Sequence, residues 1–199
     1  MRILYGVVGE GMGHATRSRV ILEHLLRQKH DICVIVSGRA HKFLAEKFKA
    51  REHIAVHEIE GLNLAFEGNE LDVPESILQN LEKAPAAFTK NLGVMNDMLE
   101  GFRPQVVISD FESTAYFYGR LNRIPVISID NMQVINRCRH DRFVTADASF
   151  AFNLARIAVK AKLPGAYHYL VSSFFFPPVR KPRTTLVSPI LRPEILAAK

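Results

Sequence analysis

The first 26 residues constrain the fold more than any other stretch of the sequence. An apolar run over residues 2–8 is followed by glycines at positions 9, 11 and 13, and then by apolar residues at helical spacing up to Leu26. This pattern predicts a strand, a tight glycine turn and a helix. The first turn of a helix has free N–H groups and a partial positive charge, so we expect an anion-binding site at this turn.

The spacing of the glycines argues against the usual dinucleotide-binding fingerprint. The pattern G-x-G-x-x-G needs its third glycine at the position of His14, so hydride chemistry with a nicotinamide cofactor is disfavoured. The expected first helical turn also carries Arg17 and Arg19 rather than acids, which opposes the helix dipole by about 0.3–1 kcal/mol for each charge. A bound anion would relieve this mismatch. In the alternative, both arginines point into solvent and the glycines only form a turn.

The rest of the chain alternates strand and helix patterns. Strands are expected over residues 31–37, 54–59, 104–110, 124–130, 167–174 and 184–187, and helices over 38–49, 76–99, 112–121 and 147–162. The alternation predicts an α/β fold, a Rossmann-like doubly wound parallel sheet in a single domain. We expect this domain to cover residues 1–188 and an interdomain linker to begin over 189–199.

Local patterns give further expectations for the connections and helices. Residues 61–75 contain the apolar trio Leu64-Ala65-Phe66, which fits a lid, a docking surface or a small satellite core. Pro85 should break or kink the helix over 76–99. Residues 131–145 are polar and basic, which predicts a loop. The helix over 147–162 is expected to bury the apolar face formed by Phe150, Leu154, Ile157, Ala158 and Ala161.

Composition and motifs argue against nucleic-acid-binding, metal-binding, secreted and membrane-spanning proteins. The formal net charge of +6 suits a phosphorylated ligand, an anionic membrane surface or nucleic acid, but no helix-turn-helix, zinc or RNA-binding signature accompanies it, so nucleic acid is not expected. The eight histidines lack metal-ligand spacing, so no metal site is expected. Cys33 and Cys138 form no C-x-x-C pair, and we find neither a signal peptide nor an apolar run of about 18 residues, so a cytoplasmic location is expected.

The expected strand order brings two distant residues to one cleft. In the usual order 3-2-1-4-5 the first and fourth strands are neighbours, with a crevice above their carboxyl ends. His14 follows the first strand and Asp110 ends the fourth. A neutral imidazole can accept a proton from a hydroxyl group, and an adjacent carboxylate fixes its tautomer and stabilises the imidazolium. His14 could instead be a loop histidine bonded to backbone, and Asp110 a helix N-cap.

Three segments carry a resemblance to a known family. Gly-Glu-Gly-Met-Gly-His-Ala-Thr-Arg-Ser over residues 9–18 resembles the N-terminal glycine loop of GT-B glycosyltransferases. The nearest branch is the one related to the UDP-GlcNAc transferase that makes lipid II, which includes proteins of teichoic-acid biosynthesis. Residues 106–110 resemble the family strand that ends in an Asp near the base, and residues 128–133 resemble a segment that helps line the acceptor cleft.

The resemblance implies two Rossmann-like domains, of which the N-terminal one binds the acceptor and the C-terminal one binds most of the nucleotide sugar. This chain has the length of the N-terminal domain, so the donor half is missing and the 199-residue chain alone is expected to be nearly inactive. The implied donor is a UDP-sugar, the acceptor is a hydroxyl compound or a polyprenyl-linked lipid, and no cofactor or metal is required. The expected catalytic residues are His14 and Asp110, and the expected substrate or phosphate ligands are Gly11, Met12, Gly13, Thr16, Arg17, Asp130, Asn131 and Gln133.

A second segment bears on where an acceptor is held. Residues 148–193 contain no acidic residue, and basic residues over 156–183 surround the run Phe174-Phe175-Phe176. This composition suits peripheral contact with an anionic membrane or a polyprenyl phosphate. The alternative is a solvated helix face followed by a buried strand. Two other functions stay open: a sugar-nucleotide 2-epimerase on the same fold, and a non-catalytic nucleotide- or phosphate-binding module.

Overall fold

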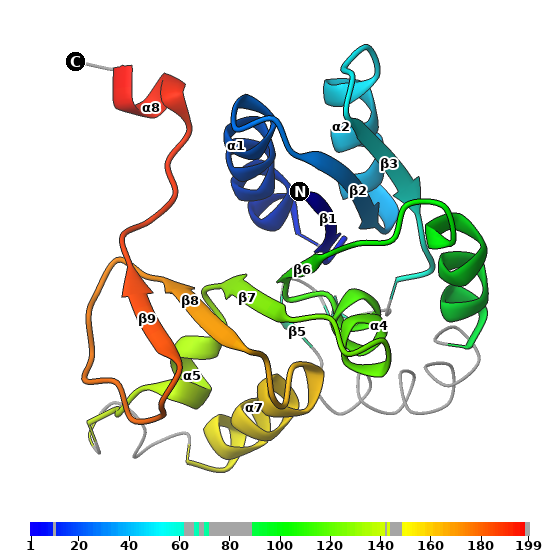
Figure 1. Ribbon diagram of the computed structural model, residues 1–199. Coiled ribbons are helices and arrows are strands. Elements are labelled where there is room, and N and C mark those ends of the chain that lie inside the picture. Colours follow the sequence, from blue (N-terminus) through cyan, green and yellow to red (C-terminus); the bar gives the residue numbers. More distant parts are fainter. Residues whose placement is uncertain are drawn as a thin grey trace.

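A seven-stranded parallel sheet forms the centre of the molecule (Figure 1). The computed structural model describes residues 1–9, 11–61, 66–67, 70–71, 89–141, 143 and 149–197. The strands, in spatial order, are β3 (Ile54–Glu58), β2 (Asp31–Val36), β1 (Arg2–Val7), β6 (Val106–Asp110), β7 (Val126–Asp130), β8 (His168–Ser172) and β9 (Thr184–Val187). The predicted Rossmann-like fold is confirmed. The predicted order 3-2-1-4-5 is also confirmed, because β6 and β7 are the strands expected as the fourth and fifth over residues 104–110 and 124–130. β8 and β9 extend the sheet at one edge.

Helices cover both faces of the sheet, as Figure 1 shows. The described helices are α1 (Met12–Arg27), α2 (Gly38–Phe48), an unlabelled helix over residues 89–99, α4 (Ser113–Leu121), α5 (Gln133–Arg137), α7 (Ser149–Lys162) and the short α8 (Pro193–Ala197). Leu4 belongs to one buried cluster, with Met95 and Ala115, whereas Tyr5 belongs to the other, with Leu22. Successive residues of β1 are thus buried on opposite faces, which is why its sequence is apolar without alternation.

The turn between β1 and α1 depends on close backbone packing. A Cβ atom on Gly9 would lie 2.0 Å from the carbonyl oxygen of Ser37, which follows β2. No side chain fits there, so the glycine allows the turn to lie against the neighbouring β2–α2 connection. Gly13, inside α1, has no atom within 4 Å of such a Cβ. The first glycine therefore serves packing, whereas the third is free of that constraint.

The expectation of a loop over residues 131–145 was wrong at its start, where α5 forms. Its polar side chains are satisfied inside the protein instead of in solvent: Asn136 Nδ2 donates to Gln133 Oε1 at 3.0 Å, and Arg137 Nε donates to Thr184 Oγ1 at 2.6 Å. Gln133, Asn136 and Arg137 are all buried. The polar composition predicted a loop because hydrogen bonding between distant segments leaves no local pattern.

The predicted buried face of α7 was also wrong. Phe150 is 81% exposed and Ile157 is 63% exposed, whereas Val159 and Leu163 are buried. The strand expected over 167–174 ends at Ser172, and the three phenylalanines 174–176 that follow are exposed. Of the segment over 61–75, β4 (Phe66–Glu67) pairs antiparallel with β5 (Glu70–Leu71); Leu64, Ala65, Pro85 and the helix expected over 76–88 lie outside the described residues.

Candidate functional site

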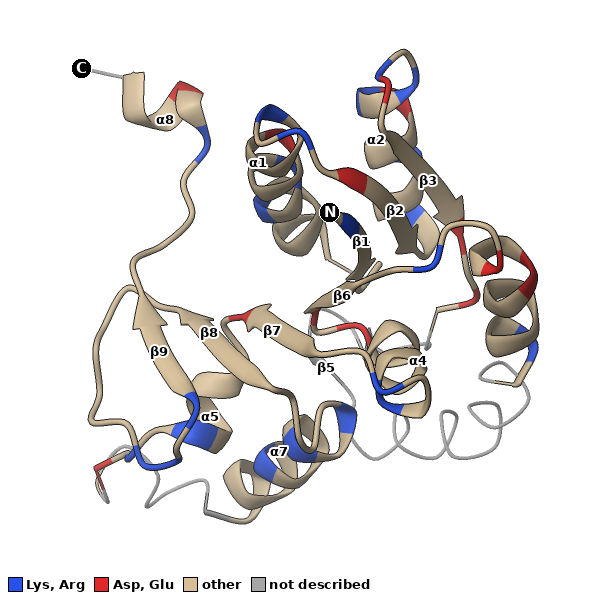
Figure 2. Cartoon of the chain, viewed as in Figure 1, with Lys and Arg blue, Asp and Glu red and all other residues tan. Residues whose placement is uncertain are grey.

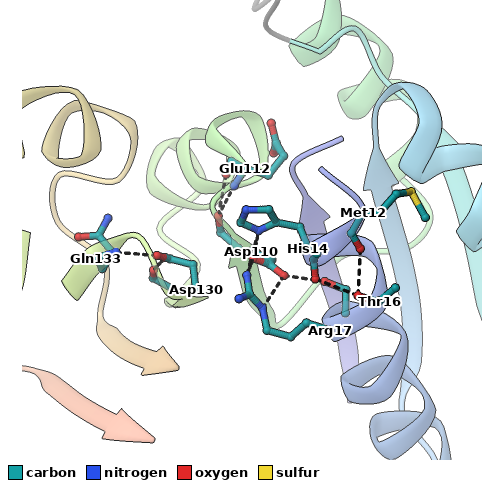
Figure 3. Close-up of polar contacts among 12 residues, drawn as sticks. Met12, His14, Thr16, Arg17, Asp110, Glu112, Asp130 and Gln133 are labelled. Atoms are coloured by element: carbon teal, nitrogen blue, oxygen red, sulfur yellow. Dashed lines mark hydrogen bonds and ion pairs between the residues drawn. The ribbon is translucent and has the colours of Figure 1, made fainter. Parts of the chain in front are cut away.

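His14 and Asp110 meet at the carboxyl edge of the sheet. Val7, at the end of β1, pairs in register with Asp110, at the end of β6, and α1 begins five residues after Val7. His14 Nδ1 lies 2.7 Å from Asp110 Oδ1. The Asp110 side chain is completely buried, whereas the His14 side chain is 18% exposed. The sheet therefore holds the carboxylate in the interior, and the partly exposed imidazole lies against it (Figure 3).

Three side chains of α1 contact the Asp110 carboxylate, and Figure 3 shows two of them, His14 and Arg17. Besides His14, Ser18 Oγ donates to Oδ2 at 2.8 Å, Arg17 Nε approaches Oδ2 at 3.2 Å, and Arg17 Nη2 pairs with Oδ1. Burial raises the pKa of Asp110, but the hydrogen bond with His14 and the positive charge of Arg17 outweigh burial and hold that pKa below its ordinary value. Asp110 is thus a carboxylate that only accepts hydrogen bonds.

The ionised carboxylate determines the tautomer of His14. Because Asp110 cannot donate, Nδ1 of His14 carries the proton in their contact, and Nε2 of the neutral ring keeps its lone pair. Arg17 Nη2 lies 2.9 Å from the same Nδ1, but both are donors, and they lie close because both bond Oδ1 of Asp110. The arrangement leaves one ring nitrogen able to accept a proton.

Residues after β6 hold the site from the other side. Phe111 has φ +57°, a conformation that is strained for an aromatic residue, and its ring stacks on His14 with centroids 6.3 Å apart. Glu112 accepts hydrogen bonds from the backbone N–H groups of Thr114 at 2.8 Å and Ala115 at 2.6 Å. Glu112 is therefore the N-cap of α4. The alternatives of a capping role for Asp110 and of a backbone-bonded His14 are not what the structure shows.

The charge mismatch expected at the start of α1 is resolved inside the protein. Arg17 pairs with Asp110, and Arg19 pairs with Glu194 at 2.8 Å and approaches Glu23 at 3.6 Å. These carboxylate partners, which sequence alone did not show, offset both charges, so the mismatch does not by itself require a bound anion. The N-cap of α1 is Gly11, which has no side chain and therefore cannot accept a hydrogen bond from the first-turn N–H groups.

A cavity of about 660 Å³ lies beside this site. Its wall includes Met12, Gly13, Thr16 and Arg17 from α1, and Asn131 from the end of β7. Five predicted ligand residues therefore share one cavity. The Thr16 hydroxyl donates to the backbone oxygen of Met12 at 2.9 Å, and Arg17 is engaged by Asp110.

Two other predicted ligands, Asp130 and Gln133, lie in the interior instead (Figure 3). Asp130 accepts a hydrogen bond from Ser128 Oγ at 2.7 Å and another from the Gln133 backbone N–H at 2.8 Å. Both side chains are fully buried and hold the start of α5 in place, and neither is among the residues that line the cavity of about 660 Å³. Burial raises the pKa of Asp130 to about 6, although both hydrogen bonds oppose this shift.

Ser18 is the contact at this site that sequence reasoning missed. His14, Arg17 and Ser18 are three and four residues apart, so they lie on one face of a helix. That spacing was available as a signal once His14 was assigned to the cleft. Within the described part of the chain, no group of three or more His, Cys, Asp and Glu side chains could hold a metal ion, and none of the described helices is long and apolar enough to cross a membrane.

Comparison with known sequences places these residues in a family. The model of a family described as "Glycosyl transferase family 1" matches residues 1–199. An uncharacterized glycosyltransferase of Methanosarcina mazei is 29% identical over 130 residues, which are 65% of this chain and 32% of that protein. The chain therefore spans about a third of the length of this curated relative.

Solved structures with the same architecture are GT-B glycosyltransferases. MurG of Acinetobacter baumannii aligns with a TM-score of 0.54 and 13% identity, over 94% of this chain and 44% of that chain. Phytolacca americana UGT2, solved with UDP-2-fluoro-glucose and pterostilbene, aligns with a TM-score of 0.61 and 11% identity, over 96% and 55%. At these identities the likeness shows the fold, and this chain spans about half of each neighbour.

Proposed function

Because this chain belongs to glycosyl transferase family 1, we propose that it is the acceptor-binding part of an enzyme that transfers a sugar from a UDP-sugar to a hydroxyl group. Two neighbours in fold are described with UDP or a UDP-sugar analogue, which supports UDP as the nucleotide. The matched relatives are about twice as long as this chain, and we place most of the donor-binding residues in the part that they have in addition. The 199-residue chain alone should therefore show little turnover.

The observation that carries this proposal is the 2.7 Å contact between His14 and the buried Asp110. In the proposed step, Nε2 of His14 takes the proton of the acceptor hydroxyl, the oxygen forms a bond to the sugar carbon, and the bond from that carbon to the diphosphate breaks. The leaving UDP keeps the electron pair of the broken bond. Asp110 stabilises the imidazolium and keeps Nδ1 protonated. No step needs a metal ion.

The neighbouring cavity gives the acceptor a place to bind. Its volume of about 660 Å³ lies within the range of small-molecule sites, about 300–1,000 Å³. Thr16 and Asn131 offer polar groups in its wall, and Met132 and Ile190 offer apolar surface. We propose that Gly11, Met12, Gly13, Thr16, Arg17 and Asn131 bind substrate at this edge, with Arg17 acting through Asp110. Asp130 and Gln133 support the α5 side of the cavity from behind.

A matched pair of histidine substitutions tests the catalytic role. In a protein that joins this chain to its donor-binding half, His14→Gln should lower kcat by about 10²–10⁴-fold, because general base catalysis typically contributes that factor. His24→Gln lies on the same helix, is exposed, and should leave kcat within about twofold. The assay measures UDP release and sugar on the acceptor.

Two results would contradict the transferase proposal. Equal kcat in the two histidine variants would remove His14 as the base. Interconversion of UDP-GlcNAc isomers without transfer to any acceptor would assign the epimerase function instead. Binding of UDP by the 199-residue chain, unaffected by His14→Gln and unaccompanied by turnover in the joined protein, would favour a binding module.

The finer part of the proposal concerns the acceptor and its location. We propose a lipid-linked acceptor in cell-envelope polymer synthesis of the teichoic-acid type, with the protein in the cytoplasm and in peripheral contact with the membrane through residues 156–183. The support is the exposure of Phe174, Phe175 and Phe176 beside a segment that has no acidic residue over 148–193. Exposed aromatic side chains together with positive charge favour an anionic membrane surface.

A further inference from the structure

We infer that a pocket between α5, α7 and the segment after β8 binds a phosphate group, separately from the His14 site. The pocket has a volume of about 330 Å³, and Arg139, His140, Arg156 and Arg180 line it together with Phe152 and Asn153. Figure 2 shows Lys and Arg gathered on α5, on α7 and in the turn that leads into β9. Three guanidinium groups and an imidazole thus converge on one small cavity.

The arginines of this pocket have no acidic partner among the described residues. No carboxylate lies within 4.0 Å of Arg139, Arg156 or Arg180 in that part of the chain, although Arg17 and Arg19 are both paired. Arg180 Nη2 donates to the backbone oxygen of Asn136 at 3.2 Å, and no other side-chain hydrogen bond of Arg180 is found among the described residues. Unpaired like charges repel one another, so a bound anion would lower the free energy of this region.

The pKa of Lys181, which follows Arg180, reflects this repulsion. Burial lowers the pKa of Lys181, and the charges of Arg180, Arg137, Lys160 and Arg156 lower it further. Its Nζ contacts Asn136 Oδ1, the amide oxygen of α5. An anion in the pocket would oppose this shift, because a negative charge favours the protonated amine.

The donors present suit phosphate more than a single carboxylate. Each guanidinium can bind two oxygens side by side, and phosphate offers three or four oxygens to several such groups at once. His140 Nε2 lies 3.0 Å from the backbone oxygen of Val134, which only accepts, so Nε2 carries its proton there. Nδ1 can then accept a hydrogen bond from a P–OH group, or donate to a phosphate oxygen when the ring is protonated. The His140 ring is held edge-on to Phe152 at 5.2 Å, and Asn153 adds an amide donor.

The surroundings favour a lipid phosphate. Ile157 follows Arg156 and Val179 precedes Arg180, and both apolar side chains are exposed, as is Phe150 on α7. A lipid headgroup in the pocket would place its acyl or prenyl chains near such residues. The assignment to a lipid rests on the membrane contact proposed above, whereas the binding of phosphate does not depend on that contact.

Binding measurements on the 199-residue chain test the pocket. We expect inorganic phosphate to bind in calorimetry, and vesicles of phosphatidylcholine with phosphatidic acid to sediment the protein better than phosphatidylcholine alone. The triple variant Arg139→Gln, Arg156→Gln and Arg180→Gln should weaken both by about tenfold or more, since a charged hydrogen bond contributes about 1.5–3 kcal/mol. The matched control Arg39→Gln, Lys47→Gln and Arg51→Gln removes equal charge from exposed positions on α2 and after it, and should change binding by less than about twofold.

Each outcome decides the inference. Loss of both signals in the pocket variant alone assigns the site to lipid phosphate. Loss of phosphate binding without any dependence on phosphatidic acid keeps the pocket and assigns it to a soluble phosphate compound. Equal effects of the two triple variants, or no phosphate binding at all, would overturn the pocket. Arg139→Gln alone, whose side chain is exposed, should show a smaller loss in the same direction, and His14→Gln should leave both signals unchanged whether or not it abolishes transfer.

Discussion

Two regions of this molecule treat charge in opposite ways. At the junction of β1, α1 and β6, the buried carboxylate is paired within the protein: Asp110 is fully buried and is contacted by His14, Arg17 and Ser18. Around α7 and the segment after β8, Arg139 and Arg156 have no acidic partner among the described residues. The first region neutralises its buried charge within the protein, whereas we propose that a phosphate group neutralises the second.

This difference separates two requirements of a transferase. A general base needs a fixed orientation and one free nitrogen, and a buried hydrogen-bonded carboxylate provides both before substrate arrives. A surface that binds a phosphate or a membrane needs charge that the protein itself does not neutralise. The strained Phe111 beside Asp110 and the exposed Phe174 after β8 fit the same division, since one is held in a forced conformation and the other is free in solvent.

Of the substitutions that we predict, Asp110→Ala in the first region should cause the largest loss in the free energy of unfolding. Asp110→Ala leaves Arg17 and His14 without their acceptor, and the loss of one partner of a buried ion pair typically lowers the free energy of unfolding by about 3–5 kcal/mol. Asp97→Ala, at an exposed position of the helix over 89–99, should change it by less than about 0.5 kcal/mol. Urea denaturation measures both, and equal losses would show that the carboxylate network does not stabilise the fold.

The second largest effect concerns the buried carboxyl of β7. The pKa of Asp130 is about 6 in the folded protein against an ordinary value of 3.8, so the folded state holds the proton more tightly. Stability should therefore fall as pH rises between about 4 and 7, by up to about 3 kcal/mol. Asp130→Asn keeps an acceptor for the Gln133 N–H and cannot ionise, so it should lose this part of the slope.

Denaturation curves of wild type and Asp130→Asn from pH 4 to pH 8 measure that slope. Asp97→Asn serves as the exposed control and should follow wild type. Asp110 has the opposite sign, because its lowered pKa adds stability that is lost as pH falls. Parallel slopes for wild type and Asp130→Asn would show that Asp130 ionises in the interior as easily as in water.

Sequence patterns predicted the first region far better than the second. The β/α alternation and the rule for strand order were enough to place Val7 beside Asp110, and hence His14 beside its carboxylate. The ion pair between Arg17 and Asp110 was not predicted, because the two residues lie 93 positions apart in the sequence. Periodicity identified an apolar stripe on α7 containing Phe150, but periodicity does not say whether tertiary structure covers a stripe.

Substitutions on that stripe should give the smallest change in stability, in contrast to substitution of a buried residue beside the same helix. Phe150→Ser and Ile157→Ser remove exposed side chains, so the free energy of unfolding should stay within about 0.5 kcal/mol of wild type. Leu163→Ala, next to the same helix but fully buried, should lower it by about 2–5 kcal/mol. If Phe150 contacts lipid, Phe150→Ser should reduce sedimentation with phosphatidic acid vesicles and leave calorimetric binding of inorganic phosphate unchanged. Destabilisation by Phe150→Ser comparable to that of Leu163→Ala would instead mean that other parts of the protein bury the stripe. The α7 region would then resemble the region around Asp110, whose polar groups are buried and hydrogen-bonded within the protein.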